Sequence, residues 1–299
     1  MSAAKPAPAA GAAPALGEEL LRRFDTPGPR YTSYPTADRF VEAFGADDAV
    51  RALRQRATGP GIVAALPLSL YLHIPFCESV CYYCACNKII TRHHERAAPY
   101  LDALEAEIAL VVQHLGRGQP VSQLHFGGGS PTFLSDDEIA RVMAALHAAF
   151  AVGSGVEASI EVDPRTVTPE RLEFLRRAGF NRISFGVQDF DPQVQQAVHR
   201  VQPFDSVRDL MHAARRLGFQ SINADLIYGL PRQTPESFAR TVQQIGELRP
   251  DRIALYAYAH LPQRFKPQRR IVAAELPIAG QRVDMLGGAI AGFLQRGYQ

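Results

Sequence analysis

The feature that most constrains the fold is a repeated alternation of short apolar runs with stretches that carry helix signals. Six apolar runs are typical of strands, at residues 68–74, 123–126, 158–162, 182–187, 222–227 and 252–258. Repeated units of a strand followed by a helix predict a parallel sheet with right-handed crossovers. Six such units indicate a partial (β/α)6 barrel preceded by an N-terminal extension, and a complete eight-unit barrel is the competing interpretation.

Capping residues mark where the helices between these strands begin and end. Ser135 opens a capping box that is completed by Glu138. Thr168 and Thr234 each precede a proline at the first helical position. Gly179 and Gly218 are expected where helices stop. A further helix is expected over residues 283–296.

The four cysteines are clustered directly after the first expected strand. Cys77, Cys81 and Cys84 are spaced CxxxCxxC, and Cys86 follows two residues later. A [4Fe–4S] cluster usually takes four thiolates, so three would leave one iron open to another ligand. A zinc site completed by Cys86 and His73 is the alternative, although CxxxCxxCxC is crowded for a tetrahedron. A disulfide is not expected, and Cys86 is either a small apolar filler or has a local functional role.

Composition excludes several other classes of protein. The chain has 299 residues with a formal charge of +2, so we expect no strong attraction to nucleic acid or anionic membranes. No apolar run approaches the ~20 residues of a membrane span. We expect a cytoplasmic monomer with a disordered Ala/Pro-rich tail over 1–16, an extension over 17–66 and a barrel over 67–299. His93 and His94 lie in a basic segment that is expected to be solvated, with contact to an anionic substrate as the alternative.

Polar residues end several of the expected strands. The run 127–130 is Gly-Gly-Gly-Ser, and Glu161, Gln188 and Asp225 end or follow later strands. Because ligands bind at the carboxyl ends of strands in α/β folds, these residues should converge on one face with the cysteines. The alternatives are a plain tight turn for the glycines, structural acids at Glu161 and Asp225, and a loop amide at Gln188.

On these residues the chain resembles the radical S-adenosylmethionine (SAM) enzymes. More closely, it resembles the family of oxygen-independent coproporphyrinogen III oxidases, also called coproporphyrinogen III dehydrogenases. The matching blocks are residues 28–36, 71–77, 86–89, 127–132, 160–165, 186–190, 225–231 and 258–262. The first block, ending in Arg-Tyr-Thr-Ser-Tyr-Pro-Thr, together with the CxC at residues 84–86, is far more specific to this family than the cysteine motif alone.

The resemblance implies a set of site residues. Cys77, Cys81 and Cys84 would bind a [4Fe–4S] cluster. The first of two SAM molecules would be contacted by Tyr71, which is also the expected catalytic residue, and by Gly128 and Glu161. The second would be contacted by Tyr83, Gly129, Ser130, Gln188, Arg200, Asp225 and Ala259. The family commonly has threonine at the position of Ser130 and phenylalanine at that of Tyr83; the hydroxyl and the aromatic face are kept.

The resemblance also implies a reaction and partners. A reduced cluster would cleave SAM, and the resulting radical would remove hydrogen from two propionates of coproporphyrinogen III, leaving the vinyl groups of protoporphyrinogen IX. A flavodoxin-like or ferredoxin-like protein would donate the electron. Family members continue beyond the position of residue 299, so we expect a C-terminally truncated catalytic core. The alternatives are a haem-binding chaperone of the same superfamily and a zinc-stabilised structural module.

Overall fold

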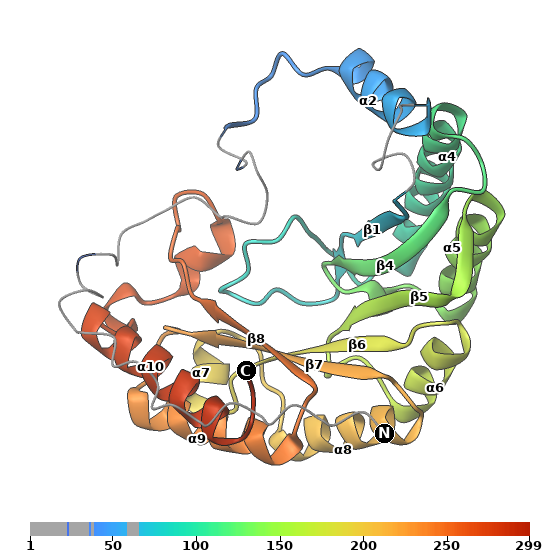
Figure 1. The fold of residues 1–299 in the computed structure, drawn as a ribbon. Helices are drawn as coiled ribbons and strands as arrows, with labels where there is room; N and C mark the ends of the chain where they lie inside the picture. The colour runs from blue at the N-terminus through green and yellow to red at the C-terminus, as the bar shows by residue number, and fades with distance from the viewer. Residues whose placement is uncertain (1–22, 24–35, 37–38, 59–65) are drawn as a thin grey trace, which may run out of the picture.

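Six parallel strands form one curled sheet that wraps around an open lumen (Figure 1). The computed structural model describes Arg23, Thr36 and residues 39–58 and 66–299. The strands are β1 (Leu68–Ile74), β4 (Pro120–Gly128), β5 (Ala151–Val162), β6 (Arg182–Gln188), β7 (Ser221–Tyr228) and β8 (Arg252–Ala257), and they pair in this order. Among the described residues, β1 and β8 are the two edges of the sheet, so the predicted partial (β/α)6 barrel is confirmed.

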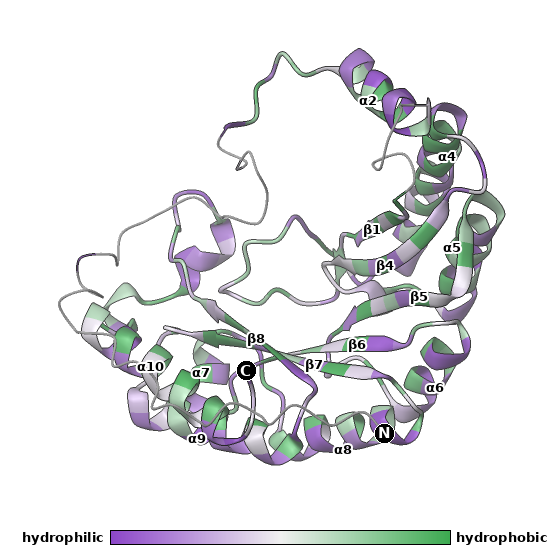
Figure 2. Ribbon diagram, viewed as in Figure 1, coloured by the Kyte–Doolittle hydropathy of each residue, from purple (hydrophilic) through white to green (hydrophobic). Residues whose placement is uncertain are grey.

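Helices cover the outer, convex face of the sheet (Figure 1). They are α4 (Ala97–Leu115), α5 (Asp136–Ala149), α6 (Pro169–Arg177), α7 (Pro192–Ala197), α8 (Phe204–Arg216), α9 (Pro235–Leu248) and α10 (Ala279–Gln295), with α2 (Ala46–Thr58) packed on α4. Short 3-10 helices are η2 (His94–Arg96), η3 (Pro131–Phe133), η4 (Lys266–Arg270) and η5 (Ala273–Glu275). Figure 2 shows both hydrophilic and hydrophobic stretches on these helices, as expected of amphipathic helices with one face on a core.

The predicted helix ends are present. The Ser135 hydroxyl accepts from the Glu138 amide at 3.2 Å, and the Glu138 carboxylate accepts from the Ser135 amide at 2.8 Å. Thr168 caps α6 in the same way through the Arg171 amide. Gly179 and Gly218 follow α6 and α8 with φ of 106° and 79°, a region that glycine enters without steric cost.

Alternation along each strand separates the core from the lumen. In β6, Ile183, Phe185 and Val187 are buried, whereas Ser184 and Gly186 between them are only partly covered. β4 and β7 largely follow this period of two, so apolar side chains pack under the helices and polar ones line the lumen, whereas the edge strand β8 has no buried residue. A parallel sheet that helices cover on both faces is apolar on both faces. This sheet has helices on its outer face only, so only that face needs to be apolar.

Several boundaries differ from the expected ones. β4 begins at Pro120 and β5 at Ala151, earlier than the expected residues 123 and 158. The added residues still pair between the two strands, Pro120 with Ala151 and Val121 with Val152. The helix expected over 283–296 spans Ala279–Gln295. Two strands of two residues each, β2 (Phe76–Cys77) and β3 (Ile89–Ile90), were not predicted, because so short a pair has no periodicity.

Parts of the chain fall outside the described residues. The tail expected over 1–16 lies there, as does the 28–36 block apart from Thr36, which is buried. In the part of the chain that the structure describes, no helix combines the length and apolar character needed to cross a membrane.

A buried carboxylate fixes the junction that follows β6. Asp189 is 2% exposed and accepts hydrogen bonds from Gln233 Nε2 at 2.5 Å, from the Thr241 hydroxyl at 3.0 Å and from the Asp191 amide at 2.6 Å. These partners belong to the β7–α9 loop, to α9 and to the start of α7. Burial raises the pKa of Asp189 to about 6, and the hydrogen bonds offset only part of that cost.

We therefore expect a pH dependence of stability that is traceable to Asp189. Its folded pKa lies above the unfolded value of about 3.9, so its favourable contribution is complete below pH ~4 and is lost as pH rises through about 6. Asp225, whose pKa burial also raises to about 6, acts in the same window. Asp189→Asn should make the fall in the free energy of unfolding between pH ~4 and ~7 shallower by about 2–3 kcal/mol, measured by denaturant unfolding of the metal-free chain.

Asp205→Asn provides the matched control, because Asp205 is an exposed acid in the first turn of α8. That variant should keep the slope of the unmodified chain. Parallel pH profiles for the unmodified chain and Asp189→Asn would show that the carboxylate of Asp189 does not titrate in this window.

Candidate functional site

The strand register places polar side chains in adjacent rows at the carboxyl end of the lumen. Tyr71 of β1 is in register with His125 of β4, and His125 with Ser159 of β5. One layer further, Glu161 of β5 is in register with Ser184 of β6. Because every strand runs in the same direction, residues at equal depth meet side by side, as the polar strand ends predict.

The cysteine loop covers this end of the lumen. Cys77 ends β2, and β2 pairs with β3, so the intervening loop is held at both of its ends. Cys81 is 8% exposed, while Cys77 and Cys84 are partly covered and Cys86 is exposed. The Cys84 amide donates to the Cys81 carbonyl at 3.1 Å, and the Tyr82 amide donates to the Val198 carbonyl at 2.9 Å.

Two guanidinium groups contact the buried sulfur. Arg200 Nη1 lies 3.4 Å and Arg165 Nη2 lies 3.5 Å from Cys81 Sγ. Both arginines also bind the carboxylate of Asp163, at 3.1 Å and 2.6 Å. Arg200 Nη2 donates to the Gly186 carbonyl at 2.7 Å. Burial alone would raise the pKa of Asp163, but Arg200 and Arg165 outweigh it and hold that pKa below its ordinary value.

The thiols differ in their ease of ionisation. Burial, with Cys84 and Cys81 nearby, raises the pKa of Cys77 to about 12. The Cys86 thiol donates a hydrogen bond to Cys84 and lowers the pKa of Cys84 to about 6 despite the opposing effect of burial. The same interaction, with burial, raises the pKa of Cys86.

The three candidate ligand cysteines and Cys86 line one cavity. Cys77, Cys81 and Cys84 line a space of about 160 Å³ together with Gly128, Gly129, Ser130, Glu161, Gln188, Arg200 and Asp225. Within the described ranges, no three His, Cys, Asp or Glu side chains converge as ligands of one metal ion. A [4Fe–4S] cluster takes each thiolate on a different iron. The buried Nε of Arg200, which has no hydrogen-bond partner among the described residues, also faces a site that suits an anionic group.

The glycine run approaches the backbone before the cysteine loop. Gly128 has φ of 116°, and a Cβ there would lie 2.8 Å from His73 Cε1. A Cβ on Gly129 would lie 2.7 Å from the Phe76 carbonyl oxygen. The Gly129 and Ser130 amides donate to the Ile74 and Phe76 carbonyls, both at 2.8 Å. These glycines are therefore required by the fold itself, whatever ligand their exposed backbone also contacts.

Glu161 lies between the glycine run and a histidine. Its Oε2 accepts from the Gly128 amide at 3.3 Å, and its Oε1 is 3.2 Å from His125 Nε2. His125 Nδ1 is 2.5 Å from the Ser159 hydroxyl, and Tyr71 stacks on the His125 ring with centroids 5.6 Å apart. Tyr71 is 59% exposed, and its hydroxyl is 3.1 Å from His73 Nδ1. Tyr71 lies on the edge strand β1, outside the cavity that the three cysteines line.

Asp225 and Gln188 line the same cavity as the cysteines and come from β7 and β6. The Asp225 carboxylate accepts from the Ser184 hydroxyl and from Asn223 Nδ2, each at 2.8 Å, and burial raises the pKa of Asp225 to about 6. Gln188 has φ of 65° at a register shift next to Gly186, a left-handed conformation that is uncommon for a residue with a side chain. Such local strain is typical of functional positions.

The remaining site residues surround a larger space below the cysteines. Tyr83, Cys84, Cys86, Glu161, Gln188, Asp225 and Ala259 line a lumen cavity of about 740 Å³. Of the residues that the resemblance assigns to SAM, only Tyr71 lines neither cavity. Gln268 was not predicted: its Nε2 donates to the carbonyls of Tyr83 at 2.9 Å and Ala259 at 3.1 Å, and no sequence signal marks it.

Arg165 and His125 were also not singled out as site residues. Arg165 follows Asp163 by two residues, and this spacing at a strand end was a usable signal. A second cavity of about 140 Å³ adjoins the first. The two share Cys77, Ser79, Ser130, Asp163 and Arg165.

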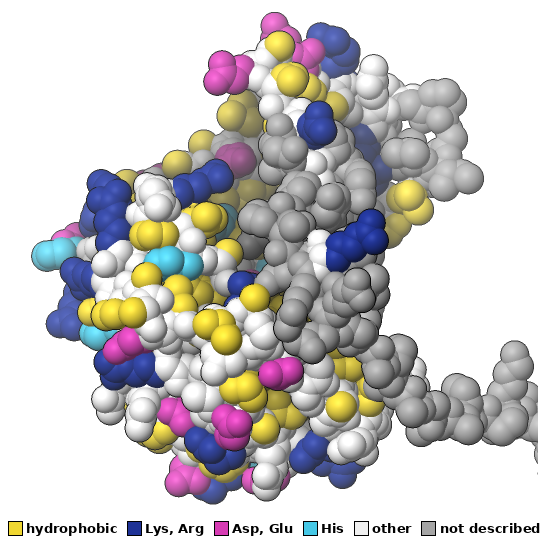
Figure 3. All heavy atoms as spheres, turned by 90° about the vertical axis from the view of Figure 1, so that its left-hand side faces the viewer, with side chains coloured by type: hydrophobic (Ala, Val, Ile, Leu, Met, Phe, Trp, Pro, Cys, Tyr) yellow, Lys and Arg dark blue, Asp and Glu magenta, His cyan; other side chains and the backbone are white. Residues whose placement is uncertain are grey.

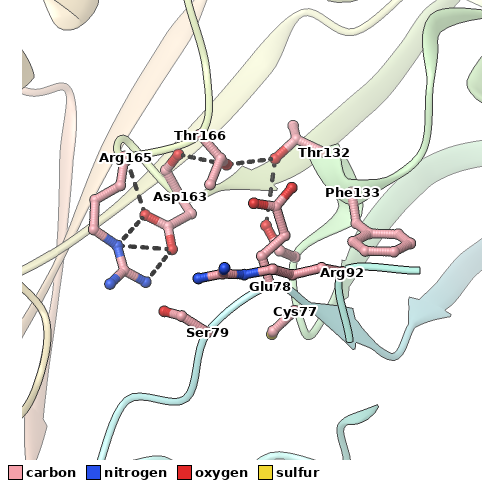
Figure 4. Close-up of a pocket in the computed structure, with 10 residues that line it drawn as sticks. Cys77, Glu78, Ser79, Arg92, Thr132, Phe133, Asp163, Arg165 and Thr166 are labelled. Carbon is pink, nitrogen blue, oxygen red and sulfur yellow. Dashed lines mark hydrogen bonds and ion pairs between the residues drawn. The ribbon is translucent and has the colours of Figure 1, made fainter. Parts of the chain in front are cut away.

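Figure 4 shows Arg165 and Asp163 on one wall of this second cavity and Arg92, Cys77 and Ser79 on another.

Comparison with known proteins identifies the class. Residues 71–245 match the family model described as the radical SAM superfamily, and the chain therefore belongs to this superfamily. Within it, the chain is similar to proteins named oxygen-independent coproporphyrinogen III oxidase, with 51% identity to that of Pseudomonas aeruginosa and 49% to that of Escherichia coli K12. Each comparison covers 94% of this chain and 60% of the relative, so the chain spans about 60% of the length of these curated relatives.

A solved structure agrees with this assignment. Coproporphyrinogen III oxidase (HemN) from Escherichia coli, a radical SAM enzyme, superimposes with a TM-score of 0.84 at 49% sequence identity. The superposition covers 90% of this chain and 60% of that chain. The α/β half-barrel with its cysteine loop at the carboxyl ends of the strands is therefore the fold of this superfamily.

We expect Gly129→Ala to destabilise the chain even without any cofactor. The added Cβ would lie 2.7 Å from the Phe76 carbonyl oxygen and 2.8 Å from two atoms of Pro75, and these backbone atoms cannot move away without breaking the hydrogen bonds at the base of the cysteine loop. A loss of about 2–4 kcal/mol is expected by denaturant unfolding of the metal-free chain.

Gly153→Ala is the matched control, because a Cβ at Gly153 meets nothing within 4 Å. That change should alter stability by about 0.5 kcal/mol or less. Equal stability of Gly129→Ala and Gly153→Ala would mean that the glycine run serves only a ligand and not the fold.

Proposed function

We propose that this chain carries the radical SAM half-barrel of an oxygen-independent coproporphyrinogen III oxidase. The proposed reaction is the oxidative decarboxylation of two propionates of coproporphyrinogen III to vinyl groups, which gives protoporphyrinogen IX in haem biosynthesis. The observation that carries the proposal is the convergence of three cysteines, the glycine run, Glu161 and Asp225 on one cavity, in a chain 49–51% identical to proteins of that name.

Cys77, Cys81 and Cys84 would hold a [4Fe–4S] cluster and leave its fourth iron open toward the lumen. When bound, the cluster and SAM supply a one-electron reduction and a radical that abstracts hydrogen. Arg165 and Arg200 would place positive charge beside the sulfur of Cys81, which stabilises an anionic cluster and raises its reduction potential.

Glu161 is suited to bind the amino group of a first SAM. Its carboxylate already accepts from the Gly128 amide, and the exposed lone pairs face the cavity. Charge-assisted hydrogen bonds to a cationic ammonium group are among the stronger polar contacts. Gly128 and Gly129 would contribute backbone groups at a position that no side chain blocks.

Asp225 and Gln188 are suited to a second SAM. Two donors, from Ser184 and Asn223, hold the Asp225 carboxylate in place, so its geometry is fixed before a ligand arrives. Arg200, in contrast, uses both terminal nitrogens on the protein, and its Nε is buried. We therefore expect Arg200 to act mainly on Cys81 and Asp163.

The reaction itself is tested by an anaerobic assay with a strong reductant, SAM and coproporphyrinogen III. Formation of protoporphyrinogen IX, with methionine and 5′-deoxyadenosine as coproducts, supports the proposal. Reconstitution of a cluster with reductive SAM cleavage but with no porphyrinogen product from a protein as long as the relatives would contradict the substrate assignment.

The ligand assignment makes a sharp prediction. Cys77→Ala, Cys81→Ala and Cys84→Ala should each lose nearly all bound iron and sulfide after anaerobic reconstitution, because two thiolates do not retain the cluster. Cys86→Ala should keep both, since its thiol donates to Cys84 rather than to iron in the proposed set. Iron and sulfide analysis with the visible absorption spectrum provides the measurement; iron loss in Cys86→Ala equal to that in the other three would overturn the assignment.

The second SAM makes a separate prediction. Equilibrium dialysis of SAM against the anaerobic holoprotein should give two molecules per chain, and Asp225→Asn should reduce this to one, because an amide cannot offer the same charge. The control is Asp205→Asn, which changes an exposed acid outside both cavities. A stoichiometry of one SAM in the unmodified protein, unchanged in Asp225→Asn, would remove the second site.

A further inference from the structure

Three side chains converge over the first glycine of the glycine run. A Cβ on Gly127 would lie 3.0 Å from Glu161 Oε1 and 3.0 Å from His125 Nε2. It would lie equally close, at 3.0 Å, to Cε2 of Tyr71. These three residues come from β5, β4 and β1. The absence of a side chain at Gly127 therefore leaves the space in which the carboxylate, the imidazole and the phenol ring meet.

His125 bridges two residues of the neighbouring strand. Its partner in register is Ser159, and Glu161 follows two residues later on the same face of β5. His125 Nδ1 lies 2.5 Å from the Ser159 hydroxyl, and Nε2 lies 3.2 Å from Glu161 Oε1. Tyr71 of β1 stacks on the ring with an interplanar angle of 18°. Both ring nitrogens and one face of the ring are engaged, and these contacts fix the orientation of the imidazole.

The carboxylate determines which nitrogen of the ring is the donor. An ionised carboxylate only accepts hydrogen bonds, so Nε2 of His125 donates to Glu161. In the neutral ring, Nδ1 then accepts from the Ser159 hydroxyl. Glu161 Oε2 accepts separately from the Gly128 amide at 3.3 Å. Each oxygen of the carboxylate thus accepts one N–H, so its orientation is fixed before a ligand binds.

The donors to Glu161 differ in kind from those to Asp163, two residues further along the chain. Asp163 is paired with the guanidinium groups of Arg165 and Arg200, which cancel most of its attraction for another cation. On the outer surface, too, acidic and basic side chains lie close together, as Figure 3 shows for one face. Among the described residues, no Lys or Arg lies within ion-pair distance of Glu161. An amide and a neutral imidazole orient this carboxylate and leave its charge for a ligand.

The stability of the fold does not account for this arrangement. The side chains of His125 and Glu161 are 36% and 42% exposed in the lumen, and a polar pair this exposed contributes little to stability. A glycine within a strand, such as Gly127, weakens the strand. His125 lines the lumen cavity of about 740 Å³ but not the cavity of the cysteines, whereas Glu161 lines both. His125 thus reaches the cysteine side only through Glu161.

We propose that His125 is a positioning residue for the first SAM, because it holds the Glu161 carboxylate in the orientation that accepts the ammonium group. The inference rests on the proposed function, in which Glu161 binds that group, and adds the residue that sets its geometry. The ring does not itself bind the ammonium group, since both of its nitrogens are engaged by the protein. Its contribution is to the affinity for SAM and not to the retention of the cluster.

Two replacements of His125 separate the two nitrogens of the ring. Glutamine places an amide N–H near the position of Nε2, whereas asparagine places one near the position of Nδ1. His125→Gln keeps a donor to Glu161 and should bind SAM within about twofold of the unmodified protein. His125→Asn lacks that donor and should bind SAM about tenfold more weakly, as expected for the loss of a hydrogen bond to a charged group.

The measurement is equilibrium dialysis against the anaerobic, reconstituted holoprotein, with iron content and visible spectrum recorded for each variant. SAM is compared with its deamino analogue, which lacks the ammonium group. His125→Asn should bind the analogue as the unmodified protein does, because the group through which Glu161 acts is missing. Iron content and spectrum should be the same in all variants. A role in packing alone would weaken the binding of both ligands.

Ser159→Ala is a second, smaller change to the same network. It removes the partner of Nδ1 and lets the ring of His125 turn away from Glu161. SAM binding should weaken by about threefold, and binding of the deamino analogue should not change. His147→Asn is the matched control, because His147 is exposed on α5 and lines neither cavity. That variant should bind both ligands normally.

Glu161→Gln tests the proposed function separately. It should weaken SAM binding at least as much as His125→Asn does, and normal SAM binding in this variant would refute the assignment of the ammonium group to Glu161. Two other results would overturn the positioning role alone. One is normal SAM binding in His125→Asn and Ser159→Ala while Glu161→Gln is impaired. The other is an equal loss in His125→Gln and His125→Asn that extends to the deamino analogue, which would assign the ring to packing.

Discussion

The site depends on one buried guanidinium. Arg200 joins Cys81 of the cysteine loop, Asp163 after β5 and the Gly186 carbonyl of β6 through three hydrogen bonds. A charge this deeply buried is tolerated only when it is paired, and Asp163 pairs with it. Gly186 has no side chain, and a Cβ there would lie 2.9 Å from Arg200 Nη2. The position of the cysteine loop over the sheet therefore depends on a strand-end acid, a mid-strand glycine and this arginine together.

The sequence predicted the scaffold because its signals are periodic and local. Strand and helix alternation, the Ser135 and Thr168 caps and the glycines after α6 and α8 each follow from rules that span only a few residues. The convergence of Glu161, Gln188 and Asp225 with the cysteines followed from topology, since parallel strands bring their carboxyl ends to one edge. The Cys77, Cys81 and Cys84 ligand set came from spacing and resemblance, and it stays a prediction.

Long-range contacts were beyond the reach of sequence patterns. Gln268 lies 185 residues from Tyr83, whose carbonyl it binds, and a glutamine between prolines and arginines in an irregular segment gives no signal of burial. The glycine run was interpreted as a ligand cradle, yet its closest neighbours are Pro75, Phe76 and His73 of the chain itself. The close approach of Gly128 and Gly129 to residues 73–76 cannot be predicted from sequence, because it appears only when the two segments lie side by side in the fold.

The cysteine loop lines more than one cavity, and the side chains that it meets differ between them. On the lumen side it meets carboxylates and amides that suit cationic and polar ligands such as SAM. On the side of the second cavity it meets Arg92 and Arg165 together with the acids Glu78 and Asp163. The ring of Tyr82 in the same loop contacts Arg270 and His199. Asp163 connects the two cavities, because it binds Arg165, which lines both of them, and Arg200, which lines the inner one. A single buried carboxylate thus positions the cations on both faces, so exchange of Asp163 should disturb the inner and the outer side of the loop together.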